Sequence, residues 1–116
     1  MGMGFAKALE PDERQIAAAL LDHWKVRGVP GSLVAAIPNA YAHGQVGLTA
    51  GLPDIIVISP QLGDRTGFLE LKRIGGRLSA WQRHIGSLLT DRGIPYCVAY
   101  GLDEAIRILE EWGALK

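Results

Sequence analysis

The sequence of 116 residues lacks the features that define several protein classes. Cys97 is its one cysteine, which excludes a disulfide framework within the chain and a cysteine-rich zinc site. Its apolar runs stop well short of the roughly 20 residues that a membrane helix needs, and the first residues contain no signal-peptide core. We therefore expect a single cytoplasmic globular domain over residues 1–116, with no membrane partner.

An excess of charge of one sign is also lacking. The formal net charge is +0, which argues against a surface covered with nucleic-acid-binding charge. The distribution is uneven, however, because five basic residues between Lys72 and Arg92 are opposed by Asp91 alone, giving this segment a net charge of +4. The segment could face phosphates, although an ordinary solvated surface also explains such a run.

A nucleotide-binding motif is missing as well, since no expected strand is followed by GxGxxG or a P-loop. Apolar periodicity instead predicts helices over 11–27 and 79–92, with Pro11 in the first turn of the earlier one. A last helix would be capped by Asp103 and ended by Gly113. Strands are expected within 32–38, 54–60, 67–73 and 94–100. The order αβββαβα predicts an α/β fold in which helices flank a mixed sheet.

Two acidic residues interrupt the expected apolar strands. Asp54 opens the strand that continues with Ile55, and Glu70 lies between two leucines in the next strand. An ionised carboxylate is costly to bury unless it finds a cation. Lys72 lies two residues after Glu70, so both side chains should point to the same face of the strand. Asp54 could join them across a hairpin, but the sequence leaves the register open.

Such a pair of carboxylates suits Mg²⁺ or Mn²⁺, which prefer oxygen ligands. The ion would make a nucleophile from water and neutralise charge on a phosphodiester, and Lys72 would orient that water. A surface Glu–Lys pair with an unrelated Asp in a turn would also explain an isolated ExK spacing.

A longer stretch of the chain resembles a known family. The segments GLPDIIVI and FLELKRIGGRLSAWQRHIGSLLTDRGIPYCVA look like the VRR-NUC family of the PD-(D/E)xK nuclease superfamily. The similarity includes the Pro-Asp pair, the strand ending in Glu-Leu-Lys, the glycine-containing turn and the Ser-x-x-Gln helix start. It covers nearly the whole chain and is similar to the stand-alone, phage-type members. The resemblance implies the restriction-endonuclease-like αβββαβ(α) core.

The resemblance also assigns roles to individual residues. Asp54 and Glu70 match the metal ligands, Lys72 the catalytic lysine and Gln82 a glutamine that supports catalysis. Glu13 matches an acid on the first helix that completes the metal site, although an acid also favours a helix N-terminus. Gln82 can equally close a capping box with Ser79, and both roles are compatible.

Further candidates would contact nucleic acid. Arg73, Arg77 and Arg83 are basic and close to the expected site, which suits phosphate contacts. Asn39 and His43 belong to a glycine-rich loop over 39–52 that could close over substrate, although Asn39 after a proline also suits a turn. The three tryptophans, Trp24, Trp81 and Trp112, fall on helical stripes where packing in a core or interface is expected.

Together these features predict a Mg²⁺- or Mn²⁺-dependent DNA endonuclease, bacterial or phage-encoded, selective for branched or four-way (Holliday) junction DNA. The resemblance implies a homodimer, whose two-fold axis would suit such a substrate. A non-catalytic DNA-binding module of the same fold is the alternative. A sequence-specific restriction-type nuclease would need an insertion for reading bases, and a plain α/β scaffold would bind no divalent ion.

Overall fold

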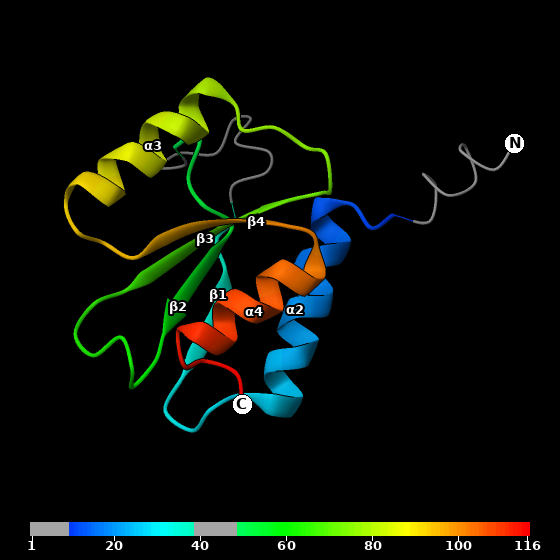
Figure 1. Ribbon diagram of the computed structural model, residues 1–116, viewed down its shortest axis with the longest axis vertical. Helices are drawn as coiled ribbons and strands as arrows, with labels where there is room; N and C mark the ends of the chain where they lie inside the picture. The colour runs from blue at the N-terminus through cyan, green and yellow to red at the C-terminus, as the bar shows by residue number, and fades with distance from the viewer. Residues whose placement is uncertain (1–9, 39–48) are drawn as a thin grey trace, which may run out of the picture.

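The computed structural model describes residues 10–38 and 49–116, and its elements follow the αβββαβα order expected from the sequence (Figure 1). The elements are α2 (Glu13–Arg27), β1 (Leu33–Ala36), β2 (Ile55–Ile58), β3 (Gly67–Lys72), α3 (Ala80–Asp91), β4 (Tyr96–Tyr100) and α4 (Leu102–Glu111). Asn39, Tyr41 and His43 lie outside the described residues. In the part that is described, no helix is both long and apolar enough to cross a membrane.

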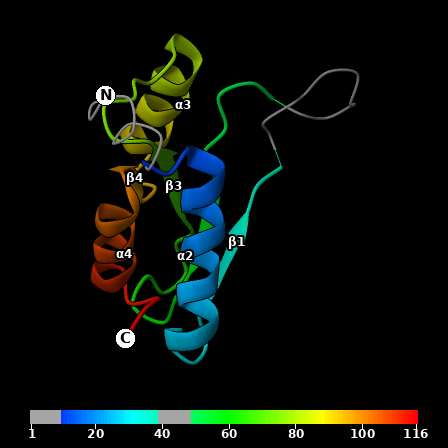
Figure 2. The ribbon, with the colours of Figure 1, turned by 90° about the vertical axis from the view of Figure 1, so that its right-hand side faces the viewer.

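The described strands form one mixed sheet in the order β1-β2-β3-β4. β1 pairs with β2, and β2 with β3, in antiparallel fashion, whereas β3 and β4 are parallel. A parallel pair needs a crossover connection, and α3 supplies it here. The predicted mixed α/β fold is therefore confirmed, with β1 and β4 at the two edges of the sheet (Figure 2).

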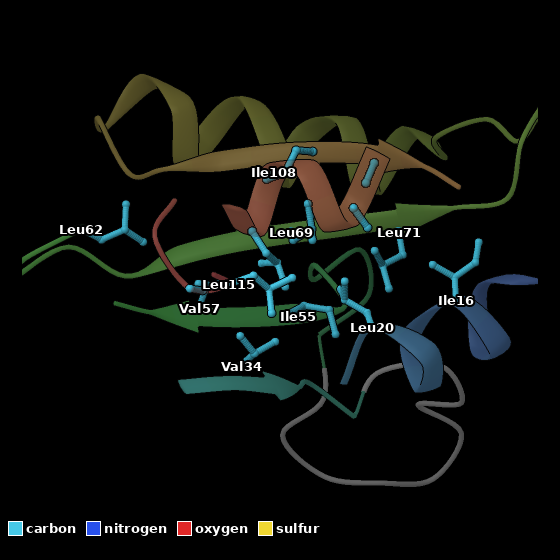
Figure 3. Close-up of a cluster of buried hydrophobic side chains, with 14 residues drawn as sticks. Ile16, Leu20, Val34, Ile55, Val57, Leu62, Leu69, Leu71, Ile108 and Leu115 are labelled. Atoms are coloured by element: carbon cyan, nitrogen blue, oxygen red, sulfur yellow. The ribbon is translucent and has the colours of Figure 1, made fainter. Parts of the chain in front are cut away.

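The hydrophobic core lies on the face of the sheet that α2 and α4 cover. Along β3, Leu69 and Leu71 are fully buried and point into this core (Figure 3). Helix α2 contributes Ile16 and Leu20, and α4 contributes Leu109. Because side chains alternate along a strand, Glu70 and Lys72 must point to the opposite face. The core packing thus decides which face of the sheet carries the polar residues.

Helix α3 packs on that opposite face, where it crosses β4. Its contact is made by Gly86: a Cβ atom built there would lie 2.7 Å from Cε2 of Tyr96. In α3, Trp81 and Leu88 are exposed, and Gly86 is the buried residue of the helix. A glycine lets the tyrosine ring approach the helix backbone, so the packing face is centred there.

Two helix starts differ from the sequence expectation. Helix α2 begins at Glu13, after a capping box in which Asp12 and Gln15 bond reciprocally, so Pro11 precedes the helix instead of opening it. Helix α4 begins at Leu102, and its N-cap is Gly101 with φ +91°, without a side-chain cap. Asp103 therefore lies inside the first turn, where its charge favours the positive end of the helix dipole.

Candidate active site

Asp54 and Glu70 face each other across the β2–β3 hairpin. Ile55 pairs with Leu69, and Asp54, directly before Ile55, is close enough to Glu70 for a hydrogen bond between the two side chains. Asp54 is fixed there by two bonds to β3: its backbone N–H donates to the Leu69 carbonyl at 3.1 Å, and its Oδ2 accepts from the Leu71 N–H at 2.7 Å. The hairpin register that the sequence left open brings the two carboxylates together.

Glu70 is almost completely buried, with 1% of its surface exposed. Its Oε2 accepts a hydrogen bond from Nε2 of Gln82 at 3.2 Å, whereas its buried Oε1 has no hydrogen-bond partner. The pKa of Glu70 is raised to about 9, chiefly by burial and then by the hydrogen bond that the protonated carboxyl makes with Asp54 and by the charge of Asp54, while the charge of Lys72 lowers it. This carboxyl therefore holds a proton at neutral pH unless a cation replaces it.

Lys72 lies on the same face as Glu70, at the end of β3. It is 7% exposed, and its Nζ lies 3.8 Å from Oε1 of Glu13, the first residue of α2. The negative charge of Glu13 also contributes to the raised pKa of Glu70. The ion pair of Lys72 with Glu13 thus joins the start of α2 to the end of β3.

Gln82 connects the start of α3 to this group. Its backbone N–H donates to Oγ of Ser79 at 3.1 Å, and its Oε1 accepts from the Ser79 N–H at 2.8 Å, which completes the predicted capping box. Its Nε2 remains available and donates to Glu70. The predicted capping box is therefore confirmed, and the contact of Gln82 with Glu70 is added by the structure, while its supporting role in catalysis remains a prediction.

A cleft of about 830 Å³ opens beside these residues. Asp54 and Gln82 line its wall, and Glu13 lines it from the side of α2. The other described lining residues come from the first turns of α2 and α3, the end of β1 and the segment before β2: Asp12, Arg14, Ala17, Ala36, Ile37, Ala50, Gly51, Leu52, Ser79 and Trp81. The cleft gives a ligand access to the carboxylate group from solvent.

The expected phosphate contacts lie between β3 and the first turns of α3. Arg73, Arg77 and Arg83 are all exposed, and Nη1 of Arg83 donates to the Leu78 carbonyl at 2.9 Å. They do not line the cleft, whose basic lining residue among those described is Arg14, so their contact with phosphates remains a prediction. Asn39 and His43 remain predictions, since they fall outside the described residues.

Two aromatic residues near the site were not assigned to it from the sequence. Tyr96 lies beside Glu70: burial and the charge of Glu70 raise the pKa of its hydroxyl to about 12, and the buried hydroxyl has no hydrogen-bond partner. Trp81, expected to pack, is 61% exposed and lines the cleft. The sequence did contain one signal for this position, since Trp81 directly precedes Gln82.

The carboxylates form a pair and not a triad. Within residues 10–38 and 49–116, no three His, Cys, Asp or Glu side chains are grouped closely enough to hold a metal ion. The prediction that Glu13 ligates a metal together with Asp54 and Glu70 remains untested. A cation at this place would take its other ligands from backbone oxygens and water, as Mg²⁺ commonly does.

Comparison with known proteins identifies the fold. No protein-family model and no curated protein matches the sequence. A solved structure described as a VRR_NUC domain protein matches with a TM-score of 0.72, covering 89% of this chain and 88% of that chain at 21% sequence identity. The fold expected from the resemblance is therefore confirmed over most of the chain.

Proposed function

We propose that this chain, which has the fold of a VRR_NUC domain protein, belongs to the VRR-NUC family and is a metal-dependent DNA endonuclease. One observation carries the proposal: Asp54, directly before β2, is bonded through its side chain to the Leu71 N–H of β3, beside Glu70, and Lys72 lies on the same face of β3 as Glu70. Asp54 also lines the cleft, together with Glu13 and Gln82. A structural role alone gives no reason to bury this group.

The residues fit a divalent cation. Glu70 keeps an unpartnered buried oxygen, and its raised pKa reflects a carboxyl that lacks a compensating positive charge. Asp54 and Glu70 would hold Mg²⁺ or Mn²⁺, with Glu13 in support. When bound, such an ion activates water as a nucleophile and stabilises the charge that develops on a phosphodiester.

Lys72 and Gln82 have distinct tasks in this proposal. The ammonium of Lys72 is nearly buried and would orient the attacking water and neutralise a phosphate oxygen. The amide of Gln82 holds Glu70 in one orientation, because it is itself fixed by the cap of α3. Arg73, Arg77 and Arg83 would bind the DNA backbone, which carries no sequence information.

Branched or four-way junction DNA is the substrate class that we propose, cut by a homodimer. A single chain of net charge +0 offers a small basic surface, and two copies related by a two-fold axis would double the +4 segment from Lys72 to Arg92. Light scattering of the purified protein would measure the oligomeric state, and a monomer at all concentrations would contradict this part.

The test is cleavage of labelled four-way junction, flap, single-stranded and linear duplex DNA with Mg²⁺, Mn²⁺ or a chelator. Metal-dependent cutting that falls at least about 100-fold in Lys72→Ala would establish the nuclease. Lys25→Ala, which removes an exposed lysine of α2, should cut normally. Folded protein that binds DNA without cutting any substrate would instead support the non-catalytic module, which the two-carboxylate cluster leaves as the second candidate.

A further inference from the structure

Trp81 occupies an unusual position for a large aromatic side chain. It is the second residue of α3, it is 61% exposed, and it lines the same cleft as Asp54 and Gln82. The other two tryptophans behave differently: Trp24 and Trp112 pack against the core, and Nε1 of Trp24 donates to Ser32. Trp81 alone of the three presents its indole to solvent, beside the proposed catalytic group.

The backbone that carries this indole is held firmly. Gly51, with φ +83°, packs against Trp81 so closely that a Cβ atom built there would lie 2.7 Å from its carbonyl carbon and 2.9 Å from its Cβ. His84 meets the indole at 80°, with ring centroids 5.9 Å apart. A perpendicular contact covers at most one face of the indole. Gly51 and His84 thus contact Trp81 on its backbone and its ring, although the side chain itself remains largely exposed.

The sequence around Trp81 indicates what binds there. Arg77 and Arg83 lie four residues before and two residues after Trp81, both are exposed, and they belong to the segment whose net charge is +4. Aromatic faces combined with basic side chains are typical of sites that bind unpaired nucleotides, because bases stack on the ring while phosphates meet the charges. In a duplex each base is already stacked on both sides. A free aromatic face therefore favours a base outside the double helix.

We propose that Trp81 stacks on an unpaired base of the DNA that enters the cleft, and so selects substrates with an unpaired nucleotide beside the cut phosphate. This inference rests on the proposed function for its DNA ligand. It deepens that function by replacing recognition of overall DNA shape with recognition of one exposed base. A second copy of the chain is the competing occupant of an exposed tryptophan, and the test below separates the two.

The experiment measures binding by fluorescence anisotropy with a chelator present, so that cleavage plays no part. The probes are a labelled duplex with a short unpaired thymidine flap, the same duplex with abasic residues in the flap, and a fully paired duplex. Stacking should make the wild type bind the thymidine flap roughly 5- to 100-fold more tightly than the abasic flap. Trp81→Phe should keep most of this ratio, and Trp81→Leu should reduce it to about one.

Val26→Ala provides the control, because Val26 is 84% exposed on α2 and does not line the cleft. Thermal melting of each variant checks the fold, and light scattering checks the oligomeric state. A thymidine-to-abasic ratio that persists in Trp81→Leu would overturn the proposal. A Trp81→Leu protein that loses self-association and keeps the ratio would assign Trp81 to contact with a second copy instead.

The two proposals fail separately. If cleavage depends on metal and Lys72 but the base-to-abasic ratio is one in the wild type, the nuclease stands and the stacking proposal is wrong. If no substrate is cut while Trp81 still discriminates between the flaps, the stacking proposal stands and the nuclease is wrong. Absence of binding to every probe overturns the stacking proposal, and the cleavage assay then decides the nuclease by itself.

Discussion

Gln82 joins the cap of α3 to the buried carboxylate of Glu70. One end of its amide accepts from the Ser79 N–H at 2.8 Å, and the other donates to Oε2 of Glu70 at 3.2 Å. The cap fixes where the amide can point, since a side chain held at one end keeps few rotamers. A feature that usually stabilises a helix here also orients a proposed metal ligand.

Substitutions at Ser79 and Gln82 should separate the two roles. Ser79→Ala removes a cap side chain and should cost about 1 kcal/mol of stability while leaving cleavage close to normal. Gln82→Glu keeps the capping spacing but places a second carboxylate beside Glu70, so cleavage should fall about 10- to 100-fold. Urea unfolding and cleavage rates measure the two effects. Equal losses of cleavage in both variants would mean that only the cap matters.

Glu70→Gln should stabilise the metal-free protein at neutral and alkaline pH. The folded-state pKa of Glu70, raised to about 9 from 4.5, means that the folded protein holds a proton that the unfolded chain releases. Wild-type stability is therefore fully present below 4.5 and declines as the pH rises towards about 9, by an amount on the order of a few kcal/mol.

Urea unfolding at several pH values within that window would test this expectation. Glu70→Gln should flatten the pH dependence and abolish cleavage, whereas Glu111→Gln, which alters an exposed acid at the last residue of α4, should leave the wild-type curve unchanged. A large stability loss in Glu70→Gln with intact cleavage would refute the site.

Metal binding should release a proton. A cation at Asp54 and Glu70 favours the ionised carboxylate, so below a pH of about 9 its binding must displace the proton of Glu70. Affinity for Mn²⁺ should rise as the pH approaches that value. Calorimetry in buffers of different ionisation enthalpy counts the protons, and Asp54→Asn should bind weakly. An affinity that is independent of pH would argue against this ligand pair.

Gly86→Ala should loosen α3 from the sheet. The added methyl would lie within 3 Å of the ring and hydroxyl of Tyr96, so it should cost about 1–3 kcal/mol despite the better helix propensity of alanine. The control is Ser87→Ala at the next residue, which is exposed, and it should leave the free energy of unfolding unchanged or raise it slightly. Thermal unfolding measures both. If Gly86→Ala loses more cleavage activity than its loss of stability can explain, the docking of α3 is needed to position Gln82.

Local chemistry made most of the fold predictable. The apolar stripes of α2 and α4, the glycines after the helices and the continuous apolar strands each act over a few residues, and they set the αβββαβα order. The errors were also local. The capping box of Asp12 and Gln15 starts α2 after Pro11, and Gly101, with its positive φ, is the N-cap of α4, so that Asp103 lies within the helix.

The sequence singled out the candidate site residues but not their arrangement in space. Asp54, Glu70 and Lys72 stood out because charged residues in apolar strands need partners. The exposure of Trp81 was not predictable, because a tryptophan on an amphipathic stripe normally packs, and only the approach of Tyr96 to Gly86 turned the helix so that Trp81 faced the cleft.

The sequence by itself determined the order of helices and strands, the face that Glu70 shares with Lys72, and the capping box of Ser79 and Gln82, because each depends on spacing along a few residues. The tertiary structure alone decided the rest: the pairing of β2 with β3 that brings Asp54 to Leu71 and Glu70, the burial that raises the pKa of Glu70, and the docking of α3 that brings Gln82 to it. These depend on contacts between segments distant in the chain, whose geometry is fixed only when the core packs.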